Sequence, residues 1–221
     1  MITLVLEAST YAGSAALLED GGLIAERSVV MRGREHEALM PAVAELLAER
    51  DMRPTSVGRV VCGAGPGSFT SLRIAGAIAK GIALAAGCPL IPVSSLALLV
   101  ASGDRLQAGR YLAAVDALRG EHYVAPFEVS AEGTITALGP ESRVASSEVR
   151  AYAESVGATA IGPEQHDPQH VAPHARGAAR LSALIHATAP ADLSRWEPAY
   201  GRLAEAQVKW EATHGRPLEA V

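Results

Sequence analysis

The chain has 221 residues, of which 49% are apolar and 4% aromatic. This length allows one large domain or two small ones, and the apolar content is sufficient for a hydrophobic core. The formal net charge of −5 argues against a surface that binds nucleic acid unaided, because such surfaces are usually basic. We find no apolar run of membrane-spanning length and no signal-peptide pattern, and we expect both cysteines to be reduced. The sequence therefore predicts a soluble cytoplasmic protein.

The first part of the chain predicts three strands and a helix. Residues 2–6 form an apolar strand, and residues 14–18 and 22–30 form two more, joined by a hairpin. Residues 35–50 have one apolar face at helical spacing, and Pro41 should either cost a hydrogen bond or delay the start of the regular helix.

The next unit, from Val57 to Val93, organises the chain. A β-branched strand at 57–62 leads into a turn with the sequence Gly-Ala-Gly-Pro-Gly. A helix then starts at Ser68 or Thr70 and runs to about residue 86, with Gly87 as its stop and a strand at 90–93. The turn matches neither a Walker loop nor a dinucleotide fingerprint, which favours a structural turn over a phosphate site.

The helix of this unit is apolar on nearly every side. One ridge consists of isoleucines four residues apart, and a second strip consists mostly of alanines, while charge is confined to Arg73 and Lys80. A helix of this kind requires burial on two sides, against its own sheet and against something else. This pattern is the first indication of a partner.

The second part of the chain repeats the order of elements after a polar junction at residues 103–109. It predicts strands near 111–115, 122–129 and 134–138, a helix near 147–156, a strand at 159–161 and a helix near 174–188. A last helix is expected over residues 203–213. On periodicity alone the fold class is α/β.

The glycine-rich turn and the helix after it carry a family resemblance. The sequence G-A-G-P-G-S-F-T-S-L-R strongly resembles the G-P-G-S-F-T-G-L-R signature of the bacterial TsaB family, with Ser71 in place of the usual glycine. Residues 2–10, 34–41, 116–123 and 197–202 match the family more weakly but in the right order. The resemblance therefore covers most of the chain.

Resemblance to TsaB implies two ribonuclease H-like domains of the actin and sugar-kinase type, each with the order β-β-β-α-β-α. The expected boundaries are 1–104 for the domain that bears the partner interface, 105–195 for a smaller second domain, and 196–221 for a tail that packs back on the first.

The resemblance also implies a function. The chain would be a non-catalytic subunit that binds TsaD, with TsaE as a further partner, in the formation of N6-threonylcarbamoyladenosine at position 37 of tRNAs that read ANN codons. It would form a homodimer in isolation, contact tRNA only through the complex and avoid membranes. No cofactor would be bound tightly, although ATP could act at the level of the complex.

The interface implied by the resemblance consists of the helices near 35–50 and 70–86, which would pack on the matching pair of TsaD. The predicted interface residues are His36, Leu39, Met40, Val43, Leu47, Leu72, Ala75, Gly76, Ile78, Ala79, Ile82 and Ala83. We interpret His36 as a packing residue and not as a catalytic base.

Two other groups of residues invite a chemical interpretation. Glu7, Ser9, Thr10 and Asp116 occupy the places where actin-like proteins hold ATP phosphates and metal; they form either a vestigial nucleotide site or polar turns, and we favour turns.

The second group, His166, His170 and His174, has the spacing of a metal site. Prolines interrupt this segment, so we interpret the three as loop histidines and expect no metal. The alternative functions are an active ATP-dependent enzyme of the actin-like class and, ranked below it, a metallopeptidase. We find no set of nucleophile, base and oxyanion donors, and predict no catalytic residues.

Overall fold

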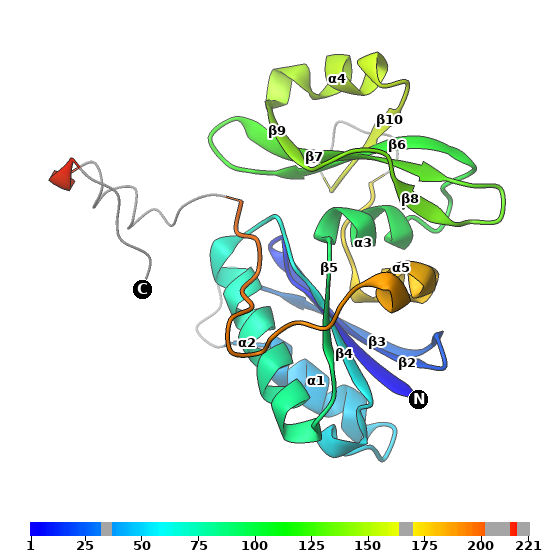
Figure 1. Cartoon of the computed structure of the whole chain (residues 1–221), viewed down its shortest axis with the longest axis vertical. Helices are drawn as coiled ribbons and strands as arrows, with labels where there is room; N and C mark the ends of the chain where they lie inside the picture. Colours follow the sequence, from blue (N-terminus) through cyan, green and yellow to red (C-terminus); the bar gives the residue numbers. More distant parts are fainter. Residues whose placement is uncertain (32–36, 164–169, 202–212, 216–221) are drawn as a thin grey trace.

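The computed structural model describes residues 1–31, 37–163, 170–201 and 213–215. The chain forms a mixed α/β fold of two ribonuclease H-like domains, each with its own sheet (Figure 1). The first sheet has the strand order β3-β2-β1-β4-β5. Its strands are β1 (Ile2–Glu7), β2 (Ala12–Glu19), β3 (Gly22–Val30), β4 (Arg59–Gly63) and β5 (Leu90–Val93).

The pairing in the first sheet follows from the sequence of its strands. β1, β4 and β5 are parallel neighbours and are apolar on both faces, as expected for strands covered by helices on each side. β2 and β3 form an antiparallel hairpin, in which Asp20 (φ 48°) and Gly21 (φ 88°) adopt the left-handed conformation that tight hairpin turns require.

Two helices cover the outer face of the first sheet, α1 (Leu39–Ala48) and α2 (Phe69–Ala86). Pro41 lies in the first turn of α1, where a missing backbone donor does no harm, so the regular helix starts later than residue 35. α2 ends at Gly87, whose φ of 63° gives the left-handed cap that glycine favours. A short 3-10 helix, η1 (Pro54–Ser56), precedes β4.

The second sheet has the order β10-β6-β7-β8, with β9 paired to β7. Its long strands β6 and β7 are antiparallel, and β10 runs parallel to β6. We did not predict β9. The elements are β6 (Gly109–Asp116), β7 (Glu121–Val129), β8 (Ile135–Ala137), β9 (Ser142–Ala145), η2 (Ser146–Glu148), α4 (Val149–Ser155) and β10 (Thr159–Ile161).

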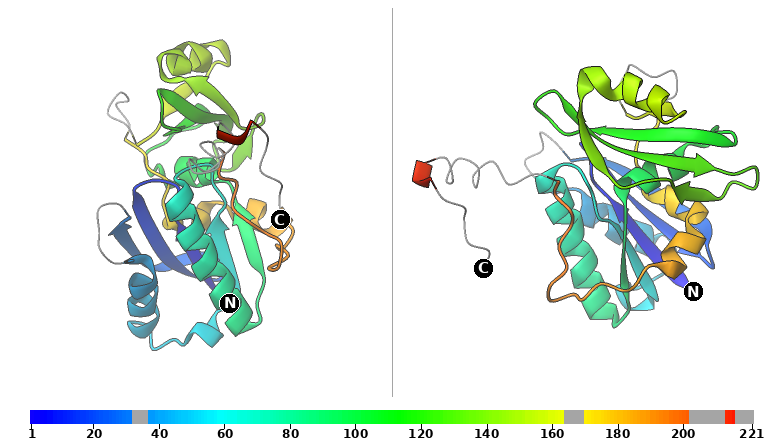
Figure 2. Two further views of the ribbon diagram at one scale, coloured as in Figure 1. Left: turned by 90° about the vertical axis from the view of Figure 1, so that its left-hand side faces the viewer. Right: turned by 45° about the horizontal axis from the view of Figure 1, so that its top comes forward.

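Helix α3 (Ser95–Ser102) lies between the two sheets (Figures 1 and 2). Every residue of α3 is buried, and its apolar side chains share one core cluster with residues of both sheets, including Val61 and Phe127. The helix layer α1–α2, the first sheet, α3, the second sheet and α4 therefore follow one another through the molecule.

The helix predicted over residues 174–188 is instead two short elements, the 3-10 helix η3 (Ala175–Arg180) and α5 (Ser182–Ala187). Gly177 presses against α3, since a Cβ there would lie 2.8 Å from the Leu98 carbonyl oxygen. The segment that makes this close contact with α3 is the 3-10 helix η3, which is wound more tightly than an α-helix. The helix predicted over residues 203–213 falls almost wholly outside the described residues.

Candidate partner-docking surface

α2 has one buried side, and the opposite side is largely open. Its buried residues face the first sheet, α1 or residues 196–198: Ser71, Leu72, Ala75, Gly76, Ala79, Ile82 and Ala83. The exposed apolar and small residues follow one another at helical spacing on the other side, and we call them the open strip: Thr70, Ala77, Gly81, Leu84 and Ala85.

For two residues of the open strip, contacts within the described chain do not explain why that amino acid is present. Leu84 is 75% exposed, the largest value among the exposed large hydrophobic side chains. Gly81 lies inside the helix, where glycine lowers stability, yet apart from its chain neighbours and the adjacent helix backbone no described atom lies within 4 Å of the position that a Cβ would occupy. A small residue with open space beside it is suited to the close approach of another helix.

The structure corrects most of the predicted interface residues. Leu39, Val43, Leu47, Leu72, Ala75, Ala79, Ile82 and Ala83 are buried in the chain's own core, so they do not line a surface. Gly76 is also buried, while Met40 is 39% exposed and Ile78 is half-buried. Apolar spacing identified a helix face, but that face packs on the chain's own sheet. His36 lies outside the described residues.

Residues 191–201, which we call the strap, run along the side of α2 (Figures 1 and 2). Backbone hydrogen bonds hold them near both ends. The Ala191 N–H donates to the carbonyl oxygen of Leu90 at 2.8 Å, and the Ala199 N–H donates to that of Ala64 at 2.7 Å. The strap therefore spans from β5 to the glycine-rich turn before α2.

Glycines allow the strap to lie close to its neighbours. A Cβ at Gly76 would be 3.1 Å from Cγ of Pro198, and one at Gly65 would overlap the carbonyl oxygen of Ala199. Gly65 also has a φ of +89°, a conformation that glycine adopts readily. Two glycines of the signature region are thus explained by contacts with the strap.

An aromatic and cationic cluster closes the N-terminal end of α2. The rings of Phe69 and Tyr200 lie 4.6 Å apart between centroids, and the Arg73 guanidinium carbon lies 5.0 Å from the Phe69 centroid. Burial and the nearby Glu197 raise the pKa of Tyr200, against the opposing effect of Arg73. The strap then reaches the second sheet, where the Tyr123 hydroxyl donates to the Tyr200 carbonyl oxygen at 3.5 Å.

By length and composition, α2 could cross a membrane, and it is the one such helix found in the described part of the chain. The sequence prediction that no apolar run reaches this length is therefore wrong for residues 69–86. Here the helix packs between β4, α1 and the strap. Some of its apolar residues accordingly lie in the core, and others lie on the open strip.

Glu7, predicted as part of a vestigial nucleotide site, is completely buried at the end of β1. Its carboxylate accepts hydrogen bonds from the Ser9 N–H at 2.5 Å and from the Ser95 hydroxyl at 2.8 Å. Burial raises the pKa of Glu7, and these hydrogen bonds oppose the rise. The carboxylate lies where a Cβ on Gly63 would have to be, so its oxygens are turned to the protein interior and hold the turn.

Thr10, Asp116 and the backbone of Ser9 have local partners as well, while the buried Ser9 hydroxyl has no hydrogen-bond partner among the described residues. The Ser9 carbonyl oxygen accepts from the Ser68 N–H at 2.7 Å, and the Thr10 hydroxyl donates to the Ala12 carbonyl oxygen at 3.1 Å. Asp116 is exposed at the end of β6, where it accepts from the Leu118 N–H at 2.7 Å. These contacts are those of polar turns. The preference for polar turns over a vestigial nucleotide site stays a prediction.

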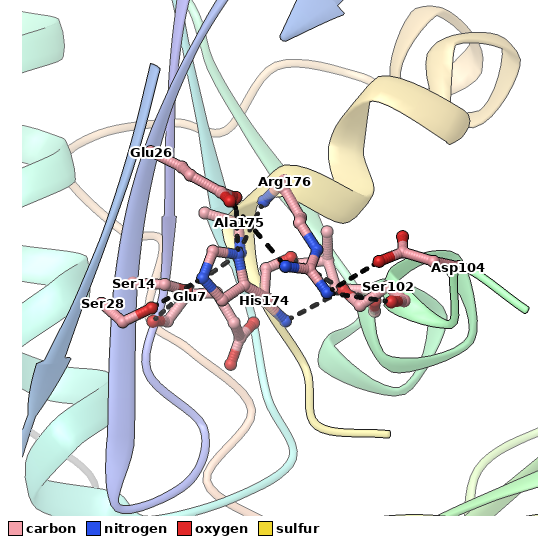
Figure 3. Close-up of polar contacts among 10 residues, drawn as sticks. Glu7, Ser14, Glu26, Ser28, Ser102, Asp104, His174, Ala175 and Arg176 are labelled. Carbon is pink, nitrogen blue, oxygen red and sulfur yellow. Dashed lines mark hydrogen bonds and ion pairs between the residues drawn. The ribbon is translucent and has the colours of Figure 1, made fainter. Parts of the chain in front are cut away.

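His174 lies in a polar network that joins β3, α3 and η3 (Figure 3). Its Nδ1 accepts from the Arg176 N–H at 3.1 Å, so Nε2 carries the proton and donates to the Ser28 hydroxyl at 3.0 Å. Glu26 lies 3.7 Å from the ring, and Arg176 pairs with Asp104 at 3.2 Å. Burial lowers the pKa of His174, and Glu26 opposes this.

The three histidines of the predicted metal spacing do not form a common site in the part of the chain that is described. His174 is engaged in the network above, His170 is exposed and its backbone pairs with Gly162, and His166 lies outside the described residues. Among the described residues no group of three His, Cys, Asp or Glu side chains could hold a metal ion.

Comparison with known proteins identifies relatives. The family model described as "TsaD: tRNA N6-adenosine threonylcarbamoyltransferase" matches residues 20–156. The tRNA threonylcarbamoyladenosine biosynthesis protein TsaB of Bacillus subtilis (strain 168) is 33% identical over 144 residues, which are 65% of this chain and 62% of the relative. TsaB of Escherichia coli (strain K12) is 37% identical over 135 residues, 60% of this chain and 58% of the relative.

A solved structure agrees with these matches. A crystal structure of an uncharacterized Pseudomonas aeruginosa protein with similarity to the peptidase YeaZ superposes with a TM-score of 0.76 at 29% identity, over 91% of this chain and 99% of that one. The matched region spans roughly 60% of the two curated relatives. Because this family model matches more than half of the chain, the chain belongs to the family that the model describes, and its curated relatives over the matched region are TsaB proteins.

Proposed function

We propose that this chain takes part in the biosynthesis of N6-threonylcarbamoyladenosine in tRNA, as a non-catalytic subunit that binds TsaD. TsaE would be a further partner, and the modified base would be position 37 of tRNAs that read ANN codons. In the absence of TsaD, the same surface would pair with a second copy of the chain.

The open strip of α2 is the observation that carries this proposal. It combines an exposed Leu84 with a Gly81 that no described atom approaches, on a helix whose other sides are already covered. An exposed apolar strip of this kind is typical of a protein interface. On α1, Met40 and Ala44 are exposed as well, so both helices can contribute to a helix-pair contact.

Absence of catalysis is supported by the surroundings of the polar candidates. Glu7 is enclosed by hydrogen bonds from Ser9 and Ser95, and Asp116 is engaged in a backbone turn. The contribution of the chain would then be to hold TsaD in a competent state.

The first test is light scattering on the chain mixed with TsaD from the same source, with and without ATP. We expect a one-to-one complex that displaces any homodimer. Leu84→Glu should abolish the complex, because it places a charge in the middle of the apolar contact, and should leave the fold intact, because the side chain is 75% exposed.

The matched control is Leu184→Glu on α5, which makes the same change at a leucine that is 40% exposed and lies off the α1–α2 layer. This variant should bind TsaD as the wild type does. Separate elution of the wild-type proteins under every condition would contradict the proposal, and so would equal loss of binding in both variants.

A further inference from the structure

Arg73 is the charged residue that borders the open strip. Arg73, Ala77 and Gly81 are four residues apart, so they follow one another on the same face of α2. The other cation of the helix, Lys80, is turned to the strap, where its Nζ lies 5.8 Å from the centroid of the Trp196 ring. Arg73 is thus the cation that a partner on the open strip would meet.

The Arg73 side chain is exposed, but its orientation is fixed from within the chain. Its guanidinium carbon lies 5.0 Å from the centroid of Phe69, and its charge opposes the rise in the pKa of the Tyr200 phenol. Among the described residues no carboxylate forms an ion pair with Arg73. The aromatic pair therefore presents a guanidinium whose donors are available beside an apolar surface.

We propose that Arg73 is the polar anchor of the docking surface and pairs with a carboxylate of the partner subunit. The partner helix that covers the open strip would carry an acidic side chain near the N-terminal end of α2. A guanidinium suits this role because its planar fork of donors matches a carboxylate and because it is weakly hydrated. This inference rests on the proposed function, since it names the chemistry of the partner at the same surface.

Desolvation explains why the partner has to supply the charge. When an apolar helix covers Ala77 and Gly81, it removes water from the neighbouring Arg73 as well. A cation that loses water without gaining a partner is strongly unfavourable, whereas a cation that gains a hydrogen-bonded carboxylate is compensated. The pairing would also fix the register of the partner helix along α2.

A tRNA phosphate is the other anion that Arg73 could meet, and the surroundings favour the protein. The neighbours of Arg73 along the strip are Ala77, Gly81 and Leu84, which offer nothing to a ribose-phosphate backbone. Phosphate recognition uses several cations together, while the chain has a net charge of −5 and Lys80 is turned away.

The test is the affinity for TsaD from the same source, measured by titration calorimetry at low and at high salt. Arg73→Gln should weaken binding by roughly tenfold to a hundredfold, the range for a lost hydrogen bond to a charged group, and should flatten the salt dependence. Arg73→Lys should lose less, since it keeps the charge without the fork. Arg150→Gln removes the same charge from α4, at the opposite end of the molecule, and should bind as wild type (Figure 1).

The outcomes separate this inference from the proposed function. Wild-type affinity and salt dependence in Arg73→Gln would overturn the anchor while leaving the complex established. If Arg73→Gln binds TsaD normally but the assembled pair binds tRNA more weakly, then Arg73 contacts a tRNA phosphate, and the proposed pairing with a partner carboxylate is overturned. A wild-type chain that does not bind TsaD would overturn both. Thermal unfolding shows whether each variant folds. If Arg73→Gln does not fold, wild-type affinity in Arg73→Lys would contradict the role proposed for the guanidinium group.

Discussion

The carboxyl group of Glu7 lies where water does not reach it, and this has a measurable effect. Burial raises its pKa above 4.5, so the native chain binds the proton more tightly than the unfolded chain. The contribution of Glu7 to the free energy of unfolding therefore decreases as pH rises from 4.5 through the raised value. Glu7→Gln removes the titration while keeping the shape, so relative to this variant the wild type should lose stability with rising pH in urea unfolding.

A stability difference between wild type and Glu7→Gln that is constant over this range would contradict the prediction. The sequence places Glu7 correctly at the end of a strand, but it does not show where the side chain goes. The interpretation as a vestigial nucleotide site depends on an exposed carboxylate. In the structure the side chain instead occupies the space left by Gly63. Its placement therefore depends on a contact between residues that are far apart in the sequence.

At the scale of the element, α2 combines poor intrinsic stability with an open surface. Gly81→Ala should stabilise the free chain by about 0.5–1 kcal/mol, because alanine is the better helix former and the new methyl group meets no atom. The same methyl group should weaken binding to TsaD if another helix approaches closely. Urea unfolding and calorimetry measure the two effects. A destabilised free chain, or a tighter complex, would be evidence against this account.

The helices and strands show which elements the sequence can predict. Strands β1 to β7 and helix α2 follow from apolar runs bounded by glycine and proline, and their observed limits lie within two residues of the predicted ones. β9 has four residues with only weak alternation, and it is held by pairing with β7. Apolar spacing led to the prediction that α1 and α2 form the docking surface, but it could not tell which side of each helix the chain covers by itself.

At the scale of the whole molecule, the two sheets are joined through α3, and the network around His174 links η3 and α3 to β3 of the first sheet (Figure 3). His174 has a pKa below 6.5 because it is buried, so the unfolded chain protonates more readily than the native one. Its contribution to stability should decrease as pH falls through 6.5 and level off below the native pKa. Glu26, Asp104 and Arg176 are the charged groups that face the ring.

His174→Asn should remove much of this pH dependence. Asparagine keeps an acceptor for the Arg176 N–H at the start of η3 and does not titrate. Urea midpoints on the two sides of pH 6.5 should therefore change less in the variant than in the wild type. A wild type that gains stability as the solution becomes more acidic, relative to His174→Asn, would have the wrong sign for this explanation.

The position of the strap along the chain has a consequence for biosynthesis. A ribosome completes every described strand before it adds residues 191–201, so the side of α2 that Pro198 and Trp196 cover stays bare during most of translation. A nascent chain at that stage exposes more apolar helix surface than the finished protein does, and such surface promotes aggregation. Because the strap is synthesised late, its packing against α2 is the step that completes the first domain and orients Arg73 for a partner.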